Sequence, residues 1–214
     1  MAKILANDGI SASGVEALKS YGYEVSTTNV AQEQLENHIN SNEINVLLVR
    51  SATTVRKDLI DACPSLKIIG RGGVGMDNID VDYAREKGLH VINTPAASSA
   101  SVAELVFAHL YGGVRYLFDA NRQMPLEGDT KFKVLKKNYA AGSELRGKTM
   151  GVIGFGRIGQ ETAKIALGIG MNVVAHDPFI DKAEVKVVLG NGATIDVSIE
   201  MDSFETVLKE ADFI

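Results

Sequence analysis

Residues Thr149 to Asp177, TMGVIGFGRIGQETAKIALGIGMNVVAHD, decide the fold of this chain. The apolar run at the start predicts a strand over Lys148 to Ile153, and the following residues predict a helix over Arg157 to Leu167. A second strand is expected over Asn172 to His176. A strand, a glycine-rich loop, a helix and a strand in this order are typical of a Rossmann unit, whose two strands are parallel.

The glycine spacing in this stretch gives each glycine a separate role. Gly154 permits a tight turn out of the strand, Gly156 lets the backbone approach a pyrophosphate, and Gly159 lets the helix pack closely. The first amides of the helix, at Arg157 and Ile158, have no partner within the helix and can bind phosphate. These five residues therefore predict a dinucleotide-binding site.

The acidic residue at the end of the second strand indicates which dinucleotide binds. Asp177 follows Gly159 by 18 residues, where its carboxylate can accept hydrogen bonds from ribose hydroxyls and would repel a 2′-phosphate. NAD is therefore predicted rather than NADP. His176 is interpreted as a wall of the coenzyme site or a surface residue, because this end of the coenzyme lies far from the hydride.

The composition suits an α/β protein and argues against several partners. The net charge of the 214 residues is −5, with no long basic stripe, so neither nucleic acid nor an anionic membrane is expected. No stretch approaches the roughly 20 apolar residues of a membrane span, and the start of the chain does not resemble a signal peptide. The single cysteine, Cys63, is interpreted as a packed residue, and the expected location is the cytoplasm.

Short apolar runs alternate with amphipathic stretches in the first part of the chain. The expected strands are 4–6, 24–26, 46–49, 67–69 and 90–92, and the expected helices are 13–20, 32–39, 57–62 and 81–87. Strands that alternate with helices pair in parallel through right-handed crossovers. These residues therefore predict one small, open parallel sheet.

The pattern changes at Thr94. A long helix is expected over 101–118, with Ser101 and Glu104 at the spacing of a capping box. Gly112 and Gly113 inside it each cost roughly 1 kcal/mol relative to alanine. The close approach of another helix would offset this cost, and a kink is the alternative.

A polar stretch with Gly128 and four lysines between 131 and 137 follows the expected helix. We interpret it as a solvated linker, and a phosphate-binding patch is the alternative. Together the patterns predict an α/β fold with two open parallel-sheet units, a flavodoxin-like domain over 1–97 and a Rossmann domain over 98–214.

Several motifs resemble the D-isomer-specific 2-hydroxyacid dehydrogenases. They are Arg50-Ser51-Ala52-Thr53, Ile69-Gly70-Arg71-Gly72-Gly73-Val74-Gly75-Met76-Asp77-Asn78-Ile79-Asp80, Asn93-Thr94-Pro95, Ser101-Val102-Ala103-Glu104-Leu105, Gly142 to Lys148 and His176-Asp177-Pro178. The resemblance covers almost the whole chain and implies a substrate domain followed by an NAD-binding domain. Within the family, it points to members that oxidise 3-phosphoglycerate to 3-phosphohydroxypyruvate in serine biosynthesis.

The resemblance assigns substrate binding to Arg50, Ser51, Arg71, Val74, Gly75 and Arg115. Val74 would also line the nicotinamide end of the coenzyme. Arg50 and Arg71 end predicted strands, where open α/β sheets bind ligands, and arginine binds carboxylate or phosphate through paired hydrogen bonds. The run from Gly72 to Gly75 could expose successive amides as an anion-binding nest.

The resemblance also implies a role between subunits. Arg115 would reach the substrate phosphate of a neighbouring subunit, in a homodimer or larger assembly formed through the 101–118 helix. A structural salt bridge is the alternative interpretation for Arg115, as it is for Arg50 and Arg71.

The chain departs from the family at three residues that the family's chemistry needs. The family's catalytic arginine, glutamate and histidine are expected beyond Ile214, so no catalytic residue is assigned here, and no metal site is expected. Three hypotheses follow: a phosphoglycerate-oxidising dehydrogenase whose sequence is incomplete at its C-terminus, an NAD-binding module without activity, and a dehydrogenase for another D-2-hydroxy acid such as glycerate or lactate.

Overall fold

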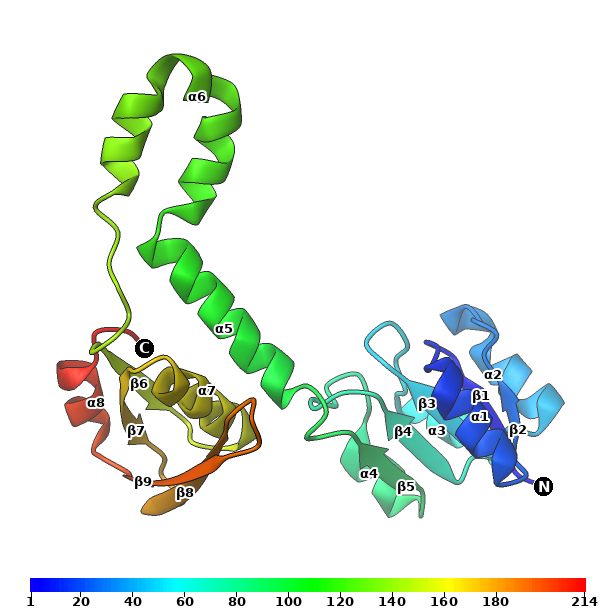
Figure 1. Cartoon of the computed structure of the whole chain (residues 1–214). Helices are drawn as coiled ribbons and strands as arrows, with labels where there is room; N and C mark the ends of the chain where they lie inside the picture. The colour runs from blue at the N-terminus through cyan, green and yellow to red at the C-terminus, as the bar shows by residue number, and fades with distance from the viewer. The chain divides into compact units, whose positions relative to one another are not determined.

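The structure is a computed structural model that describes residues 1 to 214, and the chain forms two compact units. Unit 1 comprises Met1–Ser98 and unit 2 comprises Ser99–Ile214. Figure 1 shows the helices and strands of both units, and each unit has a hydrophobic core of its own.

Unit 1 is a parallel sheet with a helix in every connection. Its strands are β1 (Lys3–Ala6), β2 (Glu24–Ser26), β3 (Val46–Val49), β4 (Ile68–Arg71) and β5 (His90–Asn93). Its helices are α1 (Ala12–Ser20), α2 (Gln32–Asn42), α3 (Lys57–Ala62) and α4 (Val81–Glu86). Every element predicted for this part of the chain is present, with small shifts at the ends.

The strands of unit 1 lie in the order β2-β1-β3-β4-β5, and all neighbours are parallel. This confirms the predicted flavodoxin-like sheet, in which the winding direction reverses between β1 and β3. Ligands of such sheets bind outside the carboxyl ends of the strands at this switch point. The register places Val49 beside Arg71 and Arg71 beside Asn93, so strand-end side chains from three strands meet there.

The core of unit 1 explains its apolar sequence runs. Leu5, Leu47 and Ile69 are fully buried because they lie on central strands. Cys63 is 1% exposed in the same core. This burial confirms that Cys63 is a packed residue, and together with the nearby charge of Glu36 it raises the pKa of the thiol to about 11.

Unit 2 begins with two helices, α5 (Ser99–Val114) and α6 (Leu117–Tyr139). The single helix predicted over 101–118 is wrong at both ends. The helix starts two residues earlier, so Ser101 lies inside its first turn and does not cap it. It ends before Tyr116, whose φ of 54° puts it in the left-handed region and redirects the chain.

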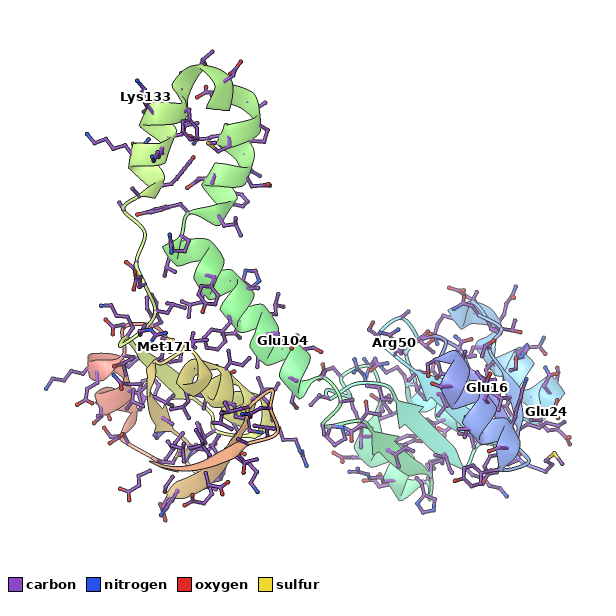
Figure 2. The ribbon with its side chains drawn as sticks, in the orientation of Figure 1. Glu16, Glu24, Arg50, Glu104, Lys133 and Met171 are labelled. Carbon is purple, nitrogen blue, oxygen red and sulfur yellow. The ribbon has the colours of Figure 1, made fainter.

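The prediction of a solvated linker is wrong, because the lysine-rich stretch is part of α6. This helix curves back on itself as an arch, with a kink at Lys131, and Lys133 lies on the arch (Figures 1 and 2). Leu135 is buried, and the rings of Tyr116 and Tyr139 pack at 6.3 Å. These tertiary contacts outweigh the helix-breaking tendency of Gly128.

Gly112 and Gly113 face open space within the chain. A Cβ on either glycine would meet nothing within 4 Å. The close helix approach predicted for them is therefore not made inside the chain. The break in helical geometry lies at Tyr116 rather than at the glycines.

The predicted Rossmann unit is confirmed. It consists of β6 (Thr149–Ile153), α7 (Arg157–Gly168) and β7 (Asn172–His176), and the two strands pair in parallel over their whole length. A bridge between Met150 and Phe213 adds a further parallel position beside β6.

Unit 2 also contains a β-hairpin that the sequence analysis does not anticipate. It consists of β8 (Lys182–Val188) and β9 (Thr194–Glu200), which are antiparallel and are followed by α8 (Phe204–Glu210). One face of the hairpin is buried through Val185, Val187 and Ile199, and the residues that alternate with them are exposed. The hairpin adds an antiparallel element to the parallel unit.

None of these helices combines the length and apolar character needed to cross a membrane.

Candidate functional site

The carboxyl end of the unit 1 sheet holds a cavity of about 670 Å³. Its polar lining includes residues at the carboxyl ends of four adjacent strands, β1, β3, β4 and β5. Its apolar lining includes two strand residues. These side chains are Asp8, Arg50, Arg71 and Asn93, with Leu48 and Ile92. The switch point of the sheet thus brings Arg50 and Arg71, both predicted from the sequence, into one cavity.

The loop after β3 carries Arg50 and Ser51 and is held from both sides. The carboxylate of Asp8 accepts hydrogen bonds from the amide of Arg50 at 2.6 Å and from the amide and hydroxyl of Thr53 at 3.1 and 2.6 Å. The side-chain amide of Asn78 donates to the carbonyls of Arg50 and Thr53 at 2.8 and 2.6 Å. Thr53 is buried whereas Arg50 and Ser51 are exposed, so the loop is anchored by its backbone.

Asp8 faces this loop as a carboxylate. Partial burial disfavours its charge, but the hydrogen bonds from Thr53 and Arg50 outweigh that effect and hold its pKa below the ordinary value. Near neutral pH the group is therefore an acceptor only.

Arg71 lines the same cavity from the end of β4. Its Nε donates to Oδ1 of Asn78 at 3.4 Å. A Cβ on Gly73 would overlap the Nη1 atom of Arg71, so the glycine leaves the space that the guanidinium occupies. Neither Arg50 nor Arg71 forms an ion pair within the chain, whereas Arg56 pairs with Asp80 at 2.9 Å. The salt-bridge interpretation of the two cavity arginines is therefore wrong.

The segment after Arg71 does not form the predicted nest at its first two glycines. The amides of Gly72 and Gly73 donate to the carbonyls of Val49 at 2.8 Å and of Arg71 at 3.0 Å, so they are not available to an anion. The side chain of Val74 is 42% exposed, and its carbonyl accepts from Nδ2 of Asn93 at 2.7 Å. Val74, Gly75 and Ser51 lie outside the cavity lining.

The glycine loop of unit 2 has the geometry that a pyrophosphate site requires. Gly154 has a φ of +90°, and a Cβ on Gly159 would overlap the carbonyl oxygen of Gly154. A Cβ on Gly156 would instead point into open space. The first bond of α7 runs from the amide of Gln160, and no side chain caps the helix. The preceding amides, including those of Arg157 and Ile158, are therefore available to phosphate.

Asp177 is already engaged with the glycine loop. Its carboxylate accepts from the amides of Phe155 at 2.8 Å and Phe179 at 2.9 Å. Each oxygen retains a lone pair for a further donor such as a ribose hydroxyl. Next to it, His176 bonds through Nδ1 to the carbonyl of Asp202 at 2.8 Å and packs edge-on against Phe204. The loop and its acidic residue thus form one cluster.

Arg115 follows α5 in unit 2 and is not part of the glycine-loop cluster. It borders a pocket of about 450 Å³ within unit 2 that Tyr111, Ser143 and Arg146 also line. It forms no ion pair within the chain.

Sequence reasoning missed the residues that hold the arginine loop, namely Asp8 and Asn78. Asp8 follows β1 as Arg50 follows β3, and this shared strand-end position was the available signal. Asn78 lies in a motif that carries the family resemblance, but its neighbours along the chain do not reveal that it reaches back to Arg50 and Thr53.

Comparison with known proteins gives a consistent assignment. The family model described as D-isomer specific 2-hydroxyacid dehydrogenase, catalytic domain, matches residues 4–209. Hydroxypyruvate reductase from Thermotoga maritima is 46% identical over 172 residues, which cover 80% of this chain and 50% of that protein. D-3-phosphoglycerate dehydrogenase from Methanocaldococcus jannaschii is 40% identical over 215 residues, which cover 100% of this chain and 38% of that protein. The chain thus spans half or less of the length of these relatives.

A solved structure supports the same assignment. D-lactate dehydrogenase from Aquifex aeolicus, complexed with NAD and lactic acid, is 27% identical and has a TM-score of 0.65. The match covers 99% of this chain and 59% of that one. The family match, the relatives that cover the whole chain and the shared α/β architecture lead to one conclusion: the chain belongs to the family of D-isomer-specific 2-hydroxyacid dehydrogenases.

Proposed function

We propose that this chain carries the substrate- and coenzyme-binding parts of a dehydrogenase that oxidises 3-phosphoglycerate to 3-phosphohydroxypyruvate, a step of serine biosynthesis. The observation that carries the proposal is the pair of arginines, Arg50 and Arg71, that share one cavity without an ion-pair partner. Guanidinium groups bind phosphate and carboxylate through paired hydrogen bonds, and 3-phosphoglycerate carries both anions. The relatives that act on phosphoglycerate and cover the full chain support this choice.

We propose NAD as the coenzyme of unit 2. The open space beside Gly156 and the uncapped start of α7 fit a pyrophosphate. The carboxylate of Asp177, at the end of β7, favours ribose hydroxyls over a 2′-phosphate. In this proposal 1–97 is the substrate domain and 98–214 is the coenzyme domain.

The chain's own groups would bind and orient the reactants. The arginines and Ser51 would hold the anionic acid, and Val74 and Gly75 would line its carboxylate and the nicotinamide end. Bound nicotinamide would supply the hydride acceptor for the hydrogen on C2. The hydroxyl proton needs a base, and we assign no residue of the chain to that role.

Two alternatives remain within the proposal. In the first alternative, the chain binds NAD and the acid but does not turn them over, because it would lack the base that takes the hydroxyl proton. Otherwise the substrate is another D-2-hydroxy acid such as glycerate or lactate, for which the hydroxypyruvate reductase and D-lactate dehydrogenase relatives give support.

We also propose a homodimer or larger assembly through α5 and the start of α6. Leu117 and Phe118 are 61% and 63% exposed, and with Gly112 and Gly113 they border a hollow of about 580 Å³. A second copy would cover this apolar surface, and Arg115 follows the same helix. The free thiol of Cys63 fits a reducing compartment, and we propose the cytoplasm.

The test measures ligand affinity of the 214-residue chain by calorimetry in the presence of NAD, with 3-phosphoglycerate, D-glycerate and D-lactate. Arg50→Ala should weaken 3-phosphoglycerate binding by roughly 10- to 150-fold, which corresponds to about 1.5–3 kcal/mol for a charged hydrogen bond. It should affect the unphosphorylated acids much less.

Arg56→Ala is the matched control, since Arg56 lies in the same unit but pairs with Asp80 outside the cavity. An unchanged preference among the three acids in the Arg50 variant would refute the phosphoglycerate assignment. Steady NADH formation by the chain itself would refute the alternative without turnover.

A further inference from the structure

We propose that Asp8 and Asn78 form a clamp that positions both arginines of the unit 1 cavity and thereby sets its affinity for an anionic acid. The inference rests on the proposed function of that cavity. Asn78 does not line the cavity, and Asp8, which does, has both carboxylate oxygens bonded to the loop. Both are positioning residues, which act through Arg50 and Arg71.

The clamp matches the chemistry of the loop that it holds. The loop from Arg50 to Thr53 presents two amides on one side, and Asp8 accepts from both. It presents two carbonyls on the other side, and the side-chain amide of Asn78 donates to both. A carboxylate has no hydrogen to donate, so it could not replace the side-chain amide of Asn78 between the two carbonyls.

Asn78 also joins the two arginines. Its Nδ2 atom holds the carbonyl of Arg50 at 2.8 Å while its Oδ1 atom lies 3.4 Å from Nε of Arg71. Because Arg71 is held through Nε, its terminal nitrogens remain available to a ligand. Gly73 leaves the space in which that guanidinium lies.

Buried polar groups anchor the Asp8 side of the clamp. The hydroxyl of Thr53 donates to Asp8 at 2.6 Å and accepts from Nδ2 of Asn7 at 2.8 Å. Asn7 bonds in turn to the amide and carbonyl of Val30 at 2.8 and 3.1 Å. Asn7 and Thr53 are only 2% and 3% exposed. A satisfied buried network of this kind is rigid, so it fixes the carboxylate relative to the sheet.

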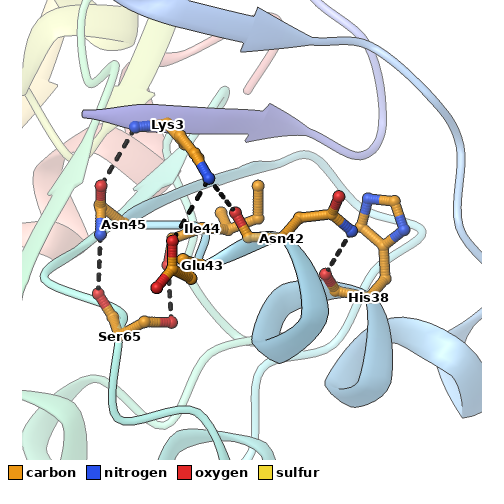
Figure 3. Close-up of polar contacts among 7 residues, drawn as sticks. All are labelled: Lys3, His38, Asn42, Glu43, Ile44, Asn45 and Ser65. Carbon is orange, nitrogen blue, oxygen red and sulfur yellow. Dashed lines mark hydrogen bonds and ion pairs between the residues drawn. The ribbon is translucent and has the colours of Figure 1, made fainter. Parts of the chain in front are cut away.

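A residue at the amino end of the same sheet, just before β3, provides a matched control. There Asn45 accepts from the amide of Lys3 at 3.1 Å and donates to the carbonyl of Ser65 at 3.3 Å (Figure 3). Asn45 thus bridges backbone segments as Asn78 does, but its hydrogen bonds go to Lys3 and Ser65 rather than to the arginines.

The experiment uses the 214-residue chain with Asp8→Asn, Asn78→Ala and the control Asn45→Ala. Calorimetry should show about 10- to 100-fold weaker binding of 3-phosphoglycerate to the first two variants, the range expected when binding groups are misplaced. The control should bind as the wild type does. Gly73→Ala displaces Arg71 while leaving the bonds of Asp8 and Asn78 to the Arg50 loop intact, and it should also weaken binding of 3-phosphoglycerate.

A second readout does not depend on the ligand. Hydrogen exchange at the amides of Arg50 and Thr53 should accelerate in Asp8→Asn and remain slow in Asn45→Ala. Wild-type affinity in folded Asp8→Asn and Asn78→Ala chains, or unchanged exchange at both amides, would overturn the clamp. If the wild-type chain binds none of the acids, the proposed function fails, while the exchange rates still decide whether the clamp holds the loop.

Discussion

The carboxylate of Asp177 has one observed contact and one proposed role. Its carboxylate holds the amide of Phe155 in the glycine loop, and Phe155 is fully buried beneath that loop. The loop geometry and the proposed ribose contact therefore depend on the same group. A substitution must be assayed in a way that separates the two.

Asp177→Ala should reverse or abolish the proposed preference for NAD over NADP. Loss of charged hydrogen bonds to the ribose should weaken NAD binding by roughly 10- to 150-fold, while NADP is relieved of repulsion. Loss of the loop contact alone would weaken both coenzymes equally. Fluorescence titration of the variant with both coenzymes distinguishes these cases. Asp181→Ala, an exposed substitution in the same segment, is the control.

At the scale of elements, the packing of α7 on β6 depends on one glycine. The Cβ of any residue at position 159 would overlap the carbonyl oxygen of Gly154, and Val152 also lies close. Backbone cannot move aside as a flexible side chain can. This is the physical reason for the third glycine of the motif, and it concerns stability rather than ligand contact.

Gly159→Ala should therefore destabilise the chain by about 1–3 kcal/mol, the usual cost of overpacking. Gly156→Ala should instead affect coenzyme binding more than stability. Its Cβ meets nothing within the chain but fills the space proposed for the pyrophosphate. It should cost at most about 1 kcal/mol, the scale of an N-cap change, and should weaken NAD binding strongly. Urea unfolding and NAD titration of both variants check this. Equal effects of the two substitutions on stability would contradict the assignment of roles.

Elements differed in how well the sequence predicted them. The strands of unit 1 were predicted because each is a short apolar run between helices, and a central strand such as β3 is apolar on both faces. The arch of α6 was mistaken for a linker because Gly128 and Pro125 oppose helix locally, whereas contacts such as that of Tyr116 with Tyr139 are distant in sequence. The hairpin β8–β9 was missed although its burial alternates, as Val185 and Val187 show.

At the scale of the whole molecule, the exposed apolar surface of α5 and α6 lacks a partner within unit 2. Leu117 and Phe118 expose more than half of their surface. Gly112 and Gly113 add no side chain that would keep a neighbour away. Exposed patches of this kind mark association sites.

The chain should therefore form a dimer or larger assembly, with a mass at least twice the 22.9 kDa of one copy. Phe118→Asp should convert it to a monomer, because a charge buried in an apolar interface is costly. Val188→Asp, at a similarly exposed apolar residue on β8, should leave the mass unchanged. Light scattering after size exclusion measures both. A wild-type monomer at high concentration would contradict the proposed assembly.

The sequence by itself determined the α/β class, the Rossmann unit and the family, because these depend on local periodicity and on glycines whose backbone roles are encoded at fixed spacing. It also indicated Arg50, Arg71 and Asp177, since the ends of parallel strands converge at one edge of a sheet.

Only the tertiary structure decided how the two arginines are held. Asp8 lies 42 residues from Arg50, and Asn78 lies 28 residues from it. No periodicity relates positions so far apart, because the strand order that brings them together arises from packing of the whole sheet. For the same reason, the structure alone showed that the glycine loop is held by the very carboxylate that we propose selects its coenzyme.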